Sequence, residues 1–350
     1  MIERPPLMSR LALGCYPLGG GYGPVDENQA RATVDTAIGC GWTFIDTAET
    51  YLLSEDRLGR ILRGRRNRLF LATKAFPCEP YTFQNLEAAL EGSLRRLQTD
   101  HIDLYQLHGP ENWVVKFSRR TPLEELADSL ERLRLSGKAL RIGVCNFPLA
   151  DLKTLSSHTD IFSTQSLYSM IDRGAEGDSL HIPVEREIIP YCAKRKIASL
   201  AFSPLSRGLL ADNLDPDRTF GPDDERHFLP RYQKGVYEHY VRLSSRLTEW
   251  ARDRGRTLVQ LAVAWTLSNP AVASTLIGAK SPDQVRAMTG AGEWRLTDTE
   301  LAEIESIVDS LPQAAKDAKM IVWDHFSPEA LEGLRKRRYE PLSGEKSEKA

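Results

Sequence analysis

The chain has 350 residues, of which 41% are hydrophobic, and its formal net charge is −2 at pH 7. This length and composition allow one large barrel or two ordinary domains. The near-neutral charge argues against two classes of protein: a nucleic-acid-binding protein, which usually has a basic excess, and a disordered chain, which often has an acidic excess. The cysteines are scattered and form no C-x-x-C pair, which predicts reduced thiols in a cytoplasmic protein: Cys15, Cys40, Cys78, Cys145 and Cys192.

Two patterns bear on targeting. The first ten residues, MIERPPLMSR, lack the apolar core of a secretory signal. No run reaches the roughly 18 apolar residues that a membrane helix needs. We therefore expect a cytoplasmic protein with a small-molecule substrate, no nucleic-acid partner and no membrane partner.

Short apolar runs alternate with longer amphipathic runs along most of the chain. This alternation predicts a parallel sheet. Eight β/α units at this length favour a closed (β/α)8 TIM barrel over an open doubly wound sheet. The predicted strands are 11–15, 42–46, 68–74, 102–108, 141–146, 160–165, 197–203 and 273–279. The predicted helices are 26–39, 55–62, 82–98, 123–135, one from about 148, 184–194, 257–268, one from 283, and 296–309.

Three segments do not follow this alternation of strands and helices. GGGYG at 19–23 has the wrong spacing for the G-x-G-x-x-G turn of a Rossmann domain, so we interpret it as an active-site loop or a plain turn. Residues 204–255 predict a long loop after the seventh strand, of the kind that is usually functional or mobile. The chain end, RKRRYEPLSGEKSEKA, predicts a solvated tail over 336–350, after a single domain over 1–335 that includes a C-terminal extension.

Polar residues fall where the predicted strands end, and these ends meet at one mouth of a barrel. They are Asp46, Lys74, His108, Cys145 with Asn146, Gln165 and Ser203, and the eighth strand ends at Gly278. A buried Lys74 needs a partner, and Asp46 is available one strand away. A phenol at Tyr51 beside this cation should have a lowered pKa and act as a proton donor. His108 can donate a hydrogen bond to a carbonyl oxygen.

Other chemistries find less support in the sequence. No Ser–His nucleophile pair is evident, and no cluster of His, Asp or Glu has metal-ligand spacing, so we expect no metal. One alternative remains within the barrel fold, an isomerase or lyase that forms a Schiff base on Lys74. The pairing of Lys74 with Asp46 and its closeness to Tyr51 favour a protonated lysine instead.

The residues at these positions resemble the aldo-keto reductase family. The matching segments run in family order over roughly residues 10–310. They are "GWTFIDTAETYLLSEDRLG" (41–59), "LATK" (71–74), "SLRRLQTDHIDLYQLH" (93–108), "GKALRIGVCNF" (137–147), "FSPLSRGLL" (202–210) and "STLIGAKSPDQV" (274–285). The resemblance implies a (β/α)8 barrel that binds NADP(H) without a Rossmann fold, with NAD(H) less favoured. It implies a reductase of aldehydes or ketones, or the reverse reaction.

The resemblance also implies individual roles. Asp46, Tyr51, Lys74 and His108 match the catalytic residues, with Tyr51 as the general acid/base. The expected cofactor contacts run from the nicotinamide to the adenosine end: Asn146 and Gln165 with Cys145, Phe202, Ser203, Leu205, Gly208, Lys280 and Gln284, together with Gly20 and Gly278.

The sequence departs from the family pattern at three places. Cys145 stands where Ser is usual, which weakens one expected hydrogen bond to the carboxamide. Leu52 and Leu53 follow Tyr51 in place of Gly-x and fill the loop beside the acid. Ala287 and Met288 occupy the place of an adenine-binding pair. Lys280 and Arg286 are cations that could bind a 2′-phosphate, so we favour NADP(H).

The substrate walls are expected from aromatic residues of the variable loops: Tyr22, Phe76, Trp113, Phe117 and the lid around Phe228, with Trp323 and Phe326 closing the pocket from above. Such a lining favours an apolar or aromatic carbonyl, or a sugar stacked on Trp113. An alternative of another class is a nucleotide-binding regulatory subunit with the same fold. The sequence selects no oligomeric state.

Overall fold

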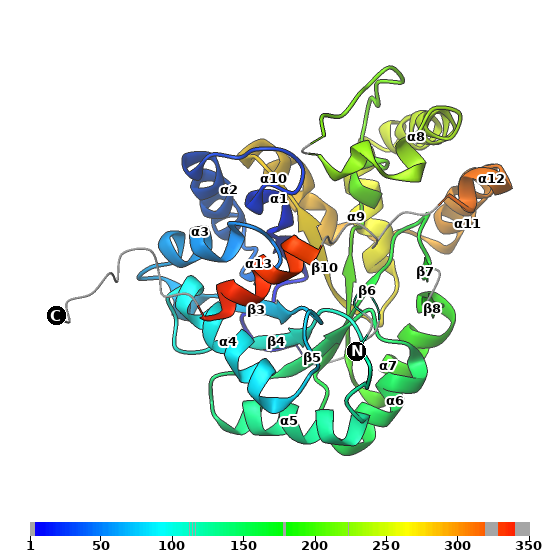
Figure 1. Cartoon of the computed structure of the whole chain (residues 1–350). Helices are drawn as coiled ribbons and strands as arrows, with labels where there is room; N and C mark the ends of the chain where they lie inside the picture. Colours follow the sequence, from blue (N-terminus) through cyan, green and yellow to red (C-terminus); the bar gives the residue numbers. More distant parts are fainter. Residues whose placement is uncertain are drawn as a thin grey trace.

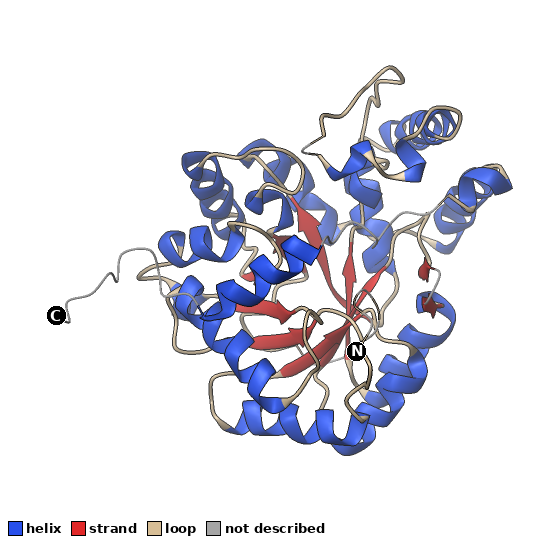
Figure 2. Cartoon of the chain, in the orientation of Figure 1, coloured by secondary structure: helices blue, strands red, loops and turns tan. Residues whose placement is uncertain are grey.

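A closed barrel of eight parallel strands forms the centre of the protein, in the order β1-β10-β9-β6-β5-β4-β3-β2. This computed structural model describes residues 4–111, 113, 115, 117–177, 180–222, 224–318 and 328–339. Figure 2 shows the strands at the centre, surrounded by helices. The barrel strands are β1 (Leu11–Gly14), β2 (Phe44–Asp46), β3 (Phe70–Ala75), β4 (Leu104–Leu107), β5 (Ile142–Cys145), β6 (Ser163–Leu167), β9 (Ala198–Phe202) and β10 (Val272–Gly278).

Helices connect successive barrel strands and form the outer layer (Figure 1). The predicted (β/α)8 barrel is confirmed, and each predicted strand and helix overlaps an observed one. The helices are α1 (Tyr16–Gly19), α2 (Glu27–Gly39), α3 (Ser54–Ile61), α4 (Phe83–Leu97), α5 (Leu123–Leu135), α6 (Leu149–His158), α7 (Ile189–Arg195), α8 (Tyr237–Arg252), α9 (Leu258–Ser268), α10 (Pro282–Thr289), α11 (Asp298–Asp309), α12 (Gln313–Lys316) and α13 (Pro328–Tyr339).

The two ends of the barrel interior differ in polarity. Phe44 and Phe70 begin their strands and pack edge to face at 5.0 Å, which fills the N-terminal end with apolar side chains. At the other end the buried side chains are polar, among them Asp46, Lys74 and Gln106. Chemistry is therefore expected at the C-terminal mouth.

Helix starts agree with the sequence where a capping side chain is present. Asp26 accepts a hydrogen bond from the Gln29 backbone, as predicted for the start of α2. Thr257 and Gln260 form a capping box at the start of α9. Among the described residues, no helix is both long and apolar enough to cross a membrane.

The prediction of a long loop over 204–255 is wrong in its second half, because this stretch contains α8. The helix buries Tyr240, Leu243 and Leu247 at helical spacing, a pattern that the charged, turn-rich residues before it obscured. The loop itself contains a tight left-handed turn over Ser206–Gly208 and single turns of 3-10 helix at Glu225–His227 and Pro230–Tyr232. A small antiparallel hairpin, β7 (Ala175–Gly177) with β8 (Leu180–Ile182), was also not predicted. The helix predicted over 184–194 begins at Val184 with a π-helical turn over Val184–Ile188 and continues as α7.

The predicted solvated tail over 336–350 is wrong for its first residues, which belong to α13. Arg338 is only 2% exposed, because carboxylates and a carbonyl oxygen surround its guanidinium group. Residues 340–350 lie outside the described part of the chain, as do Trp323 and Phe326.

Candidate active site

A buried lysine organises the mouth of the barrel. Lys74 is 0% exposed, and its Nζ donates to Asp46 Oδ1 at 2.5 Å, to Thr47 O at 2.9 Å and to Tyr51 Oη at 3.3 Å. Asp46 ends β2 and pairs with Ala72 of β3, and Lys74 lies two residues further along β3 on the same face, so the two charged side chains come together. The predicted pairing of Lys74 with Asp46 is confirmed.

The Asp46 carboxylate has further donors on its second oxygen. Gln165 Nε2 lies 3.0 Å from Oδ2, and Gln106 Nε2 lies 3.3 Å from it. Burial raises the pKa of Asp46, and the lysine and the two amides oppose this rise. Because these three donors all favour the carboxylate, we assign an ion pair with Lys74. Sequence reasoning missed Gln106, although a glutamine inside an apolar strand needs a buried partner.

The predicted net fall in the pKa of Tyr51 is wrong. Burial raises the pKa of Tyr51 to about 12, and the Lys74 cation only opposes this effect. The phenol is therefore protonated at neutral pH, as a proton donor must be. Burial favours the neutral form of Lys74, but the charge and hydrogen bond of Asp46 together with the nearby Tyr51 and Cys145 give Lys74 a raised pKa.

His108 follows β4 and faces the same mouth. Its ring packs edge to face on Tyr51 at 5.6 Å and on Phe76 at 5.9 Å between ring centroids. Burial, aided by the nearby Lys74 cation, lowers the pKa of His108 well below its usual value. The imidazole is thus neutral at pH 7. Thr50 Oγ1 lies 3.4 Å from Nδ1, and a neutral ring can donate through one nitrogen only.

Asn146 presents an unused polar atom at the end of β5. Its backbone is left-handed (φ 56°), and its Nδ2 contacts Cys145 Sγ at 3.2 Å and His108 O at 3.5 Å. Its Oδ1 is buried and has no hydrogen-bond partner among the described residues. A buried acceptor of this kind calls for a donor from a bound molecule.

Cys145 and Gln165 lie beside this acceptor. The Cys145 thiol donates weakly to Gln165 Oε1 at 3.8 Å, while the nitrogen of the same amide is committed to Asp46. Burial raises the pKa of Cys145 to about 12, so its thiol remains protonated. Only the oxygen of Gln165 is therefore available to a ligand.

The segment after β9 turns sharply. Phe202 ends the strand half-buried. The backbone is left-handed at Ser203 (φ 57°), Ser206 and Arg207. It is also left-handed at Gly208 (φ 107°), an angle that glycine adopts easily because it has no side chain. Leu205 packs half-buried against the core within this turn.

Ion pairs hold the loop that follows, and sequence reasoning missed them. Arg207 pairs with Glu225, whose other oxygen accepts from Tyr16 Oη at 2.9 Å. Arg231 pairs with Asp172 at 2.7 Å. The members of each pair are far apart in the sequence, so spacing gave no signal for them.

Lys280 lies at the edge of this loop. Its Nζ donates to Tyr22 O at 2.6 Å, and its backbone nitrogen donates to Gln284 Oε1 at 2.7 Å. Burial and the nearby cations of Arg226 and Arg218 lower the pKa of Lys280. Sequence reasoning missed these two arginines as possible anion ligands.

Other predicted residues are placed as follows. Arg286, expected to assist Lys280, pairs instead with Asp283 on the exposed face of α10. Gly20 has φ 111° after α1. Gly278 ends β10, where a Cβ atom would come within 2.9 Å of the Pro17 ring.

The predicted substrate residues differ in their burial and in their distance from Tyr51. Tyr22 and Phe76 belong to an aromatic series around Tyr51, since the Tyr16 ring packs on Tyr22 at 5.3 Å and on Tyr51 at 5.1 Å. Trp113 is buried against Gly109, just after His108, where a Cβ atom would overlap its indole. The remaining residues are Phe117, which is half-buried, and Phe228, which is exposed in the loop after β9.

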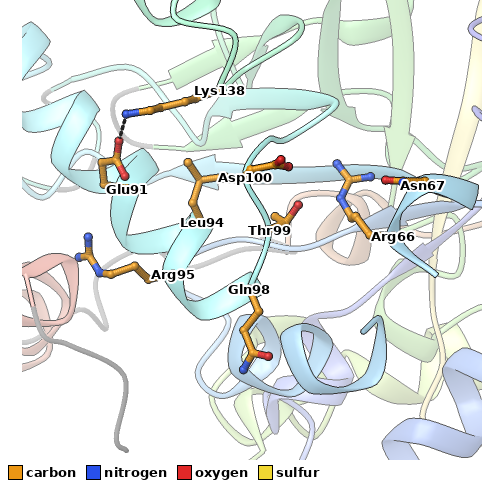
Figure 3. A pocket seen from close by; sticks show the side chains of 9 residues that line it. All are labelled: Arg66, Asn67, Glu91, Leu94, Arg95, Gln98, Thr99, Asp100 and Lys138. Carbon is orange, nitrogen blue, oxygen red and sulfur yellow. Dashed lines mark hydrogen bonds and ion pairs between the residues drawn. The ribbon is translucent and has the colours of Figure 1, made fainter. Parts of the chain in front are cut away.

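A surface hollow lies at the opposite end of the barrel, near the starts of β3, β4 and β5 (Figure 3). Its cations already have partners: Arg66 pairs with Asp103, and Lys138 pairs with Glu91. None of the predicted site residues lines it. Within the described ranges, no group of three or more His, Cys, Asp or Glu side chains could hold a metal ion.

Comparison with known proteins agrees with this geometry. The model of the Aldo/keto reductase family matches residues 10–309. The chain belongs to the aldo/keto reductase family, and it is an oxidoreductase. It is 32% identical to the aldo-keto reductase YhdN of Bacillus subtilis over 315 residues, which cover 86% of this chain and 90% of that protein.

Solved structures of the family are similar over most of the chain. The glycerol dehydrogenase AKR11B4 from Gluconobacter oxydans superimposes with a TM-score of 0.75 at 30% identity, covering 87% of this chain and 92% of that chain. An aldo-keto reductase from Klebsiella pneumoniae in complex with NADPH gives a TM-score of 0.68 at 27% identity, covering 90% and 95%.

Proposed function

We propose that this aldo/keto reductase reduces an aldehyde or ketone to an alcohol, or catalyses the reverse reaction, with NADP(H) and with Tyr51 as the general acid/base. The observation that carries the proposal is the position of Tyr51 Oη, 3.3 Å from the buried Lys74 cation and on a ring that packs against His108. An apolar or aromatic carbonyl suits the aromatic series beside Tyr51, and a sugar stacked on Trp113 is the alternative.

Each side chain has a part in reduction. The Tyr51 phenol gives its proton to the carbonyl oxygen as negative charge develops there, and the Lys74 cation stabilises the phenolate that remains. Asp46 keeps Lys74 charged and in place. The neutral His108 ring orients the oxygen through its one N–H group. Water then returns a proton to Tyr51.

The residues present fit NADP(H). The relative from Klebsiella pneumoniae was solved with NADPH, and a relative in Schizosaccharomyces pombe is named with NADP(+). The unpartnered Asn146 Oδ1 can accept a hydrogen bond from the nicotinamide carboxamide. The bound cofactor would supply or accept the hydride. The residues proposed to hold it are Gly20, Cys145, Asn146, Gln165, Phe202, Ser203, Leu205, Gly208, Gly278, Lys280 and Gln284.

Fluorescence titration with NADPH and NADH, followed by turnover on aldehydes, ketones and sugars, tests the proposal. Saturable NADPH binding together with turnover of at least one carbonyl class is the expected result. Binding of NADPH without turnover on the whole panel would point to the regulatory-subunit alternative. A protein that binds neither nucleotide would contradict the proposal.

The first prediction concerns Cys145. A Cys145→Ser variant should bind NADPH about threefold to tenfold more tightly, because a hydroxyl is a stronger donor than the buried thiol. The measurement is the Kd by fluorescence titration. A Cys145→Ala variant is the matched control and should not gain affinity. Equal Kd values for the Ser and Ala variants would remove Cys145 from the nicotinamide contacts.

A second prediction concerns the choice between the two nucleotides. A Lys280→Met variant should raise the Kd for NADPH about tenfold or more and leave the Kd for NADH nearly unchanged, because it removes a cation that a 2′-phosphate would meet. Arg286→Met is the matched control, since Arg286 is exposed and paired with Asp283. A similar loss for both nucleotides would assign Lys280 a structural role only.

A further inference from the structure

Three arginines near the end of α13 reach the two loops that flank the catalytic lysine strand. The helix is red in Figure 1 and lies beside α4. Arg335 donates to Cys78 O in the loop after β3, with its Nη2 at 2.6 Å. Arg337 donates to Leu52 O at 2.8 Å and pairs with Asp56 of α3 at 2.8 Å.

Arg338 reaches deepest. Its Nη2 lies 2.7 Å from Glu49 Oε1 and 2.8 Å from Phe76 O, and its Nη1 lies 2.8 Å from Glu79 Oε2. Glu49 is 1% exposed and lies between Asp46 and Tyr51 in the chain. The same Glu49 oxygen accepts from the Phe76 backbone nitrogen at 2.6 Å. One buried ion pair thus joins the loop that carries Tyr51 to the loop that carries Phe76.

Helix α4 fixes the position of these arginines. Arg96 donates to Arg337 O at 2.9 Å, and Arg95 donates to Arg338 O, so two carbonyl oxygens at the end of α13 have cationic partners. Arg96 also pairs with buried Glu55 at 2.7 Å. Glu55 accepts in turn from Thr73, the residue before Lys74. The contacts run without a break from α13 to the strand that carries the lysine.

We propose that Arg338 is a positioning residue for Tyr51, which acts by neutralising Glu49 and so holding the loops after β2 and β3 in their reactive arrangement. The proposal rests on Tyr51 as the general acid/base. Without the guanidinium, Glu49 would be a buried carboxylate without its cation, and the loop would have to move to hydrate it. A shift of about 1 Å in a reacting group lowers turnover about a hundredfold.

Four variants test this role: Arg338→Met, Arg338→Lys, the double variant Glu49→Gln/Arg338→Met, and Lys336→Met as a control. Lys336 is mostly exposed and pairs with Glu332 in the same helix. The kinetic readouts are kcat and the Kd for NADPH. The structural readout is alkylation of Cys78, which is 0% exposed beneath Leu334 and is followed by mass spectrometry, with half-buried Cys40 as the internal reference.

Arg338→Met should lower kcat about tenfold to a hundredfold, change the Kd for NADPH less than about threefold, and speed Cys78 alkylation at least about tenfold. Arg338→Lys should lie between this variant and the wild type, because an ammonium group cannot make the same fork of contacts. The double variant should recover much of the lost turnover, since the buried charge of Glu49 is then gone, and Glu79, which also loses Arg338, is partly exposed to water. Lys336→Met should behave like the wild type.

Faster Cys78 alkylation with unchanged kcat would show that the contact is structural only and would overturn the proposal. Unchanged alkylation and unchanged kcat would overturn it as well. If Arg338→Met does not fold, Arg338→Lys and the double variant carry the same comparison. A wild-type protein that turns over no carbonyl contradicts the proposed function itself, and the alkylation of Cys78 distinguishes that failure from the failure of the arginine contact.

Discussion

Replacement of Tyr51 by phenylalanine should lower kcat about a thousandfold while NADPH still binds with nearly unchanged Kd. The substitution removes only the hydroxyl, which lies 3.3 Å from Lys74 Nζ, and it keeps the ring that packs against His108 and Tyr16. Because none of the residues proposed to hold the cofactor depends on this hydroxyl, the loss should fall on the chemical step. Steady-state kinetics and fluorescence titration measure the two quantities separately.

Tyr16→Phe is the matched control for this experiment. The Tyr16 ring packs on Tyr51, but its hydroxyl donates to Glu225 and not to the lysine. We expect a loss of less than about tenfold in kcat from this variant, because the lost hydrogen bond is made to Glu225 and leaves the hydroxyl of Tyr51 and its contact with Lys74 in place. If Tyr51→Phe kept the turnover of the wild type, another group would have to be the proton donor.

The fold could be predicted from the sequence because its barrel units repeat one local pattern. Strands such as 102–108 are short and apolar, and helices such as 82–98 carry apolar residues at helical spacing, so each unit gives its own signal. The pairing of Asp46 with Lys74 follows from the fold, since both residues lie near the C-terminal ends of adjacent strands. The protonation state of Tyr51 could not be predicted in this way, because the net rise in its pKa depends on burial that the loop sequence does not reveal.

Features that depend on long-range contacts were not predictable in the same way. RKRR at 335–338 has the composition of a solvated tail, and only its folded position beside Glu49 and Cys78 shows otherwise. The pair of Arg207 and Glu225 likewise joins two parts of a loop that the sequence marks only as polar. In each case the local composition favours solvent exposure, and a partner far along the chain reverses it.

Removal of the lysine should affect stability and catalysis together. A Lys74→Met variant leaves the buried Asp46 carboxylate without its cation, so we expect the free energy of unfolding to fall by about 3 to 5 kcal/mol. Urea unfolding measures this change. The double variant Asp46→Asn/Lys74→Met should recover most of the stability, because the amide oxygen introduced at position 46 can still accept from Gln165 and Gln106 and no charge is left buried.

Lys74→Met and the double variant Asp46→Asn/Lys74→Met together separate the effect on stability from the effect on catalysis. The double variant should be stable and yet nearly inactive. The pKa of Tyr51 is about 12 in the wild type. The Lys74 cation lowers this pKa more than the Asp46 charge raises it, so the removal of both charges should raise the pKa further. Alcohol oxidation needs the phenolate, whose fraction below the pKa grows about tenfold per pH unit. We therefore expect the oxidation rate of the wild type to rise with pH across the range in which the protein stays folded, and the rate of the double variant to be lower at every pH. A double variant with wild-type oxidation at about pH 8 would show that Lys74 only fills space beside Tyr51.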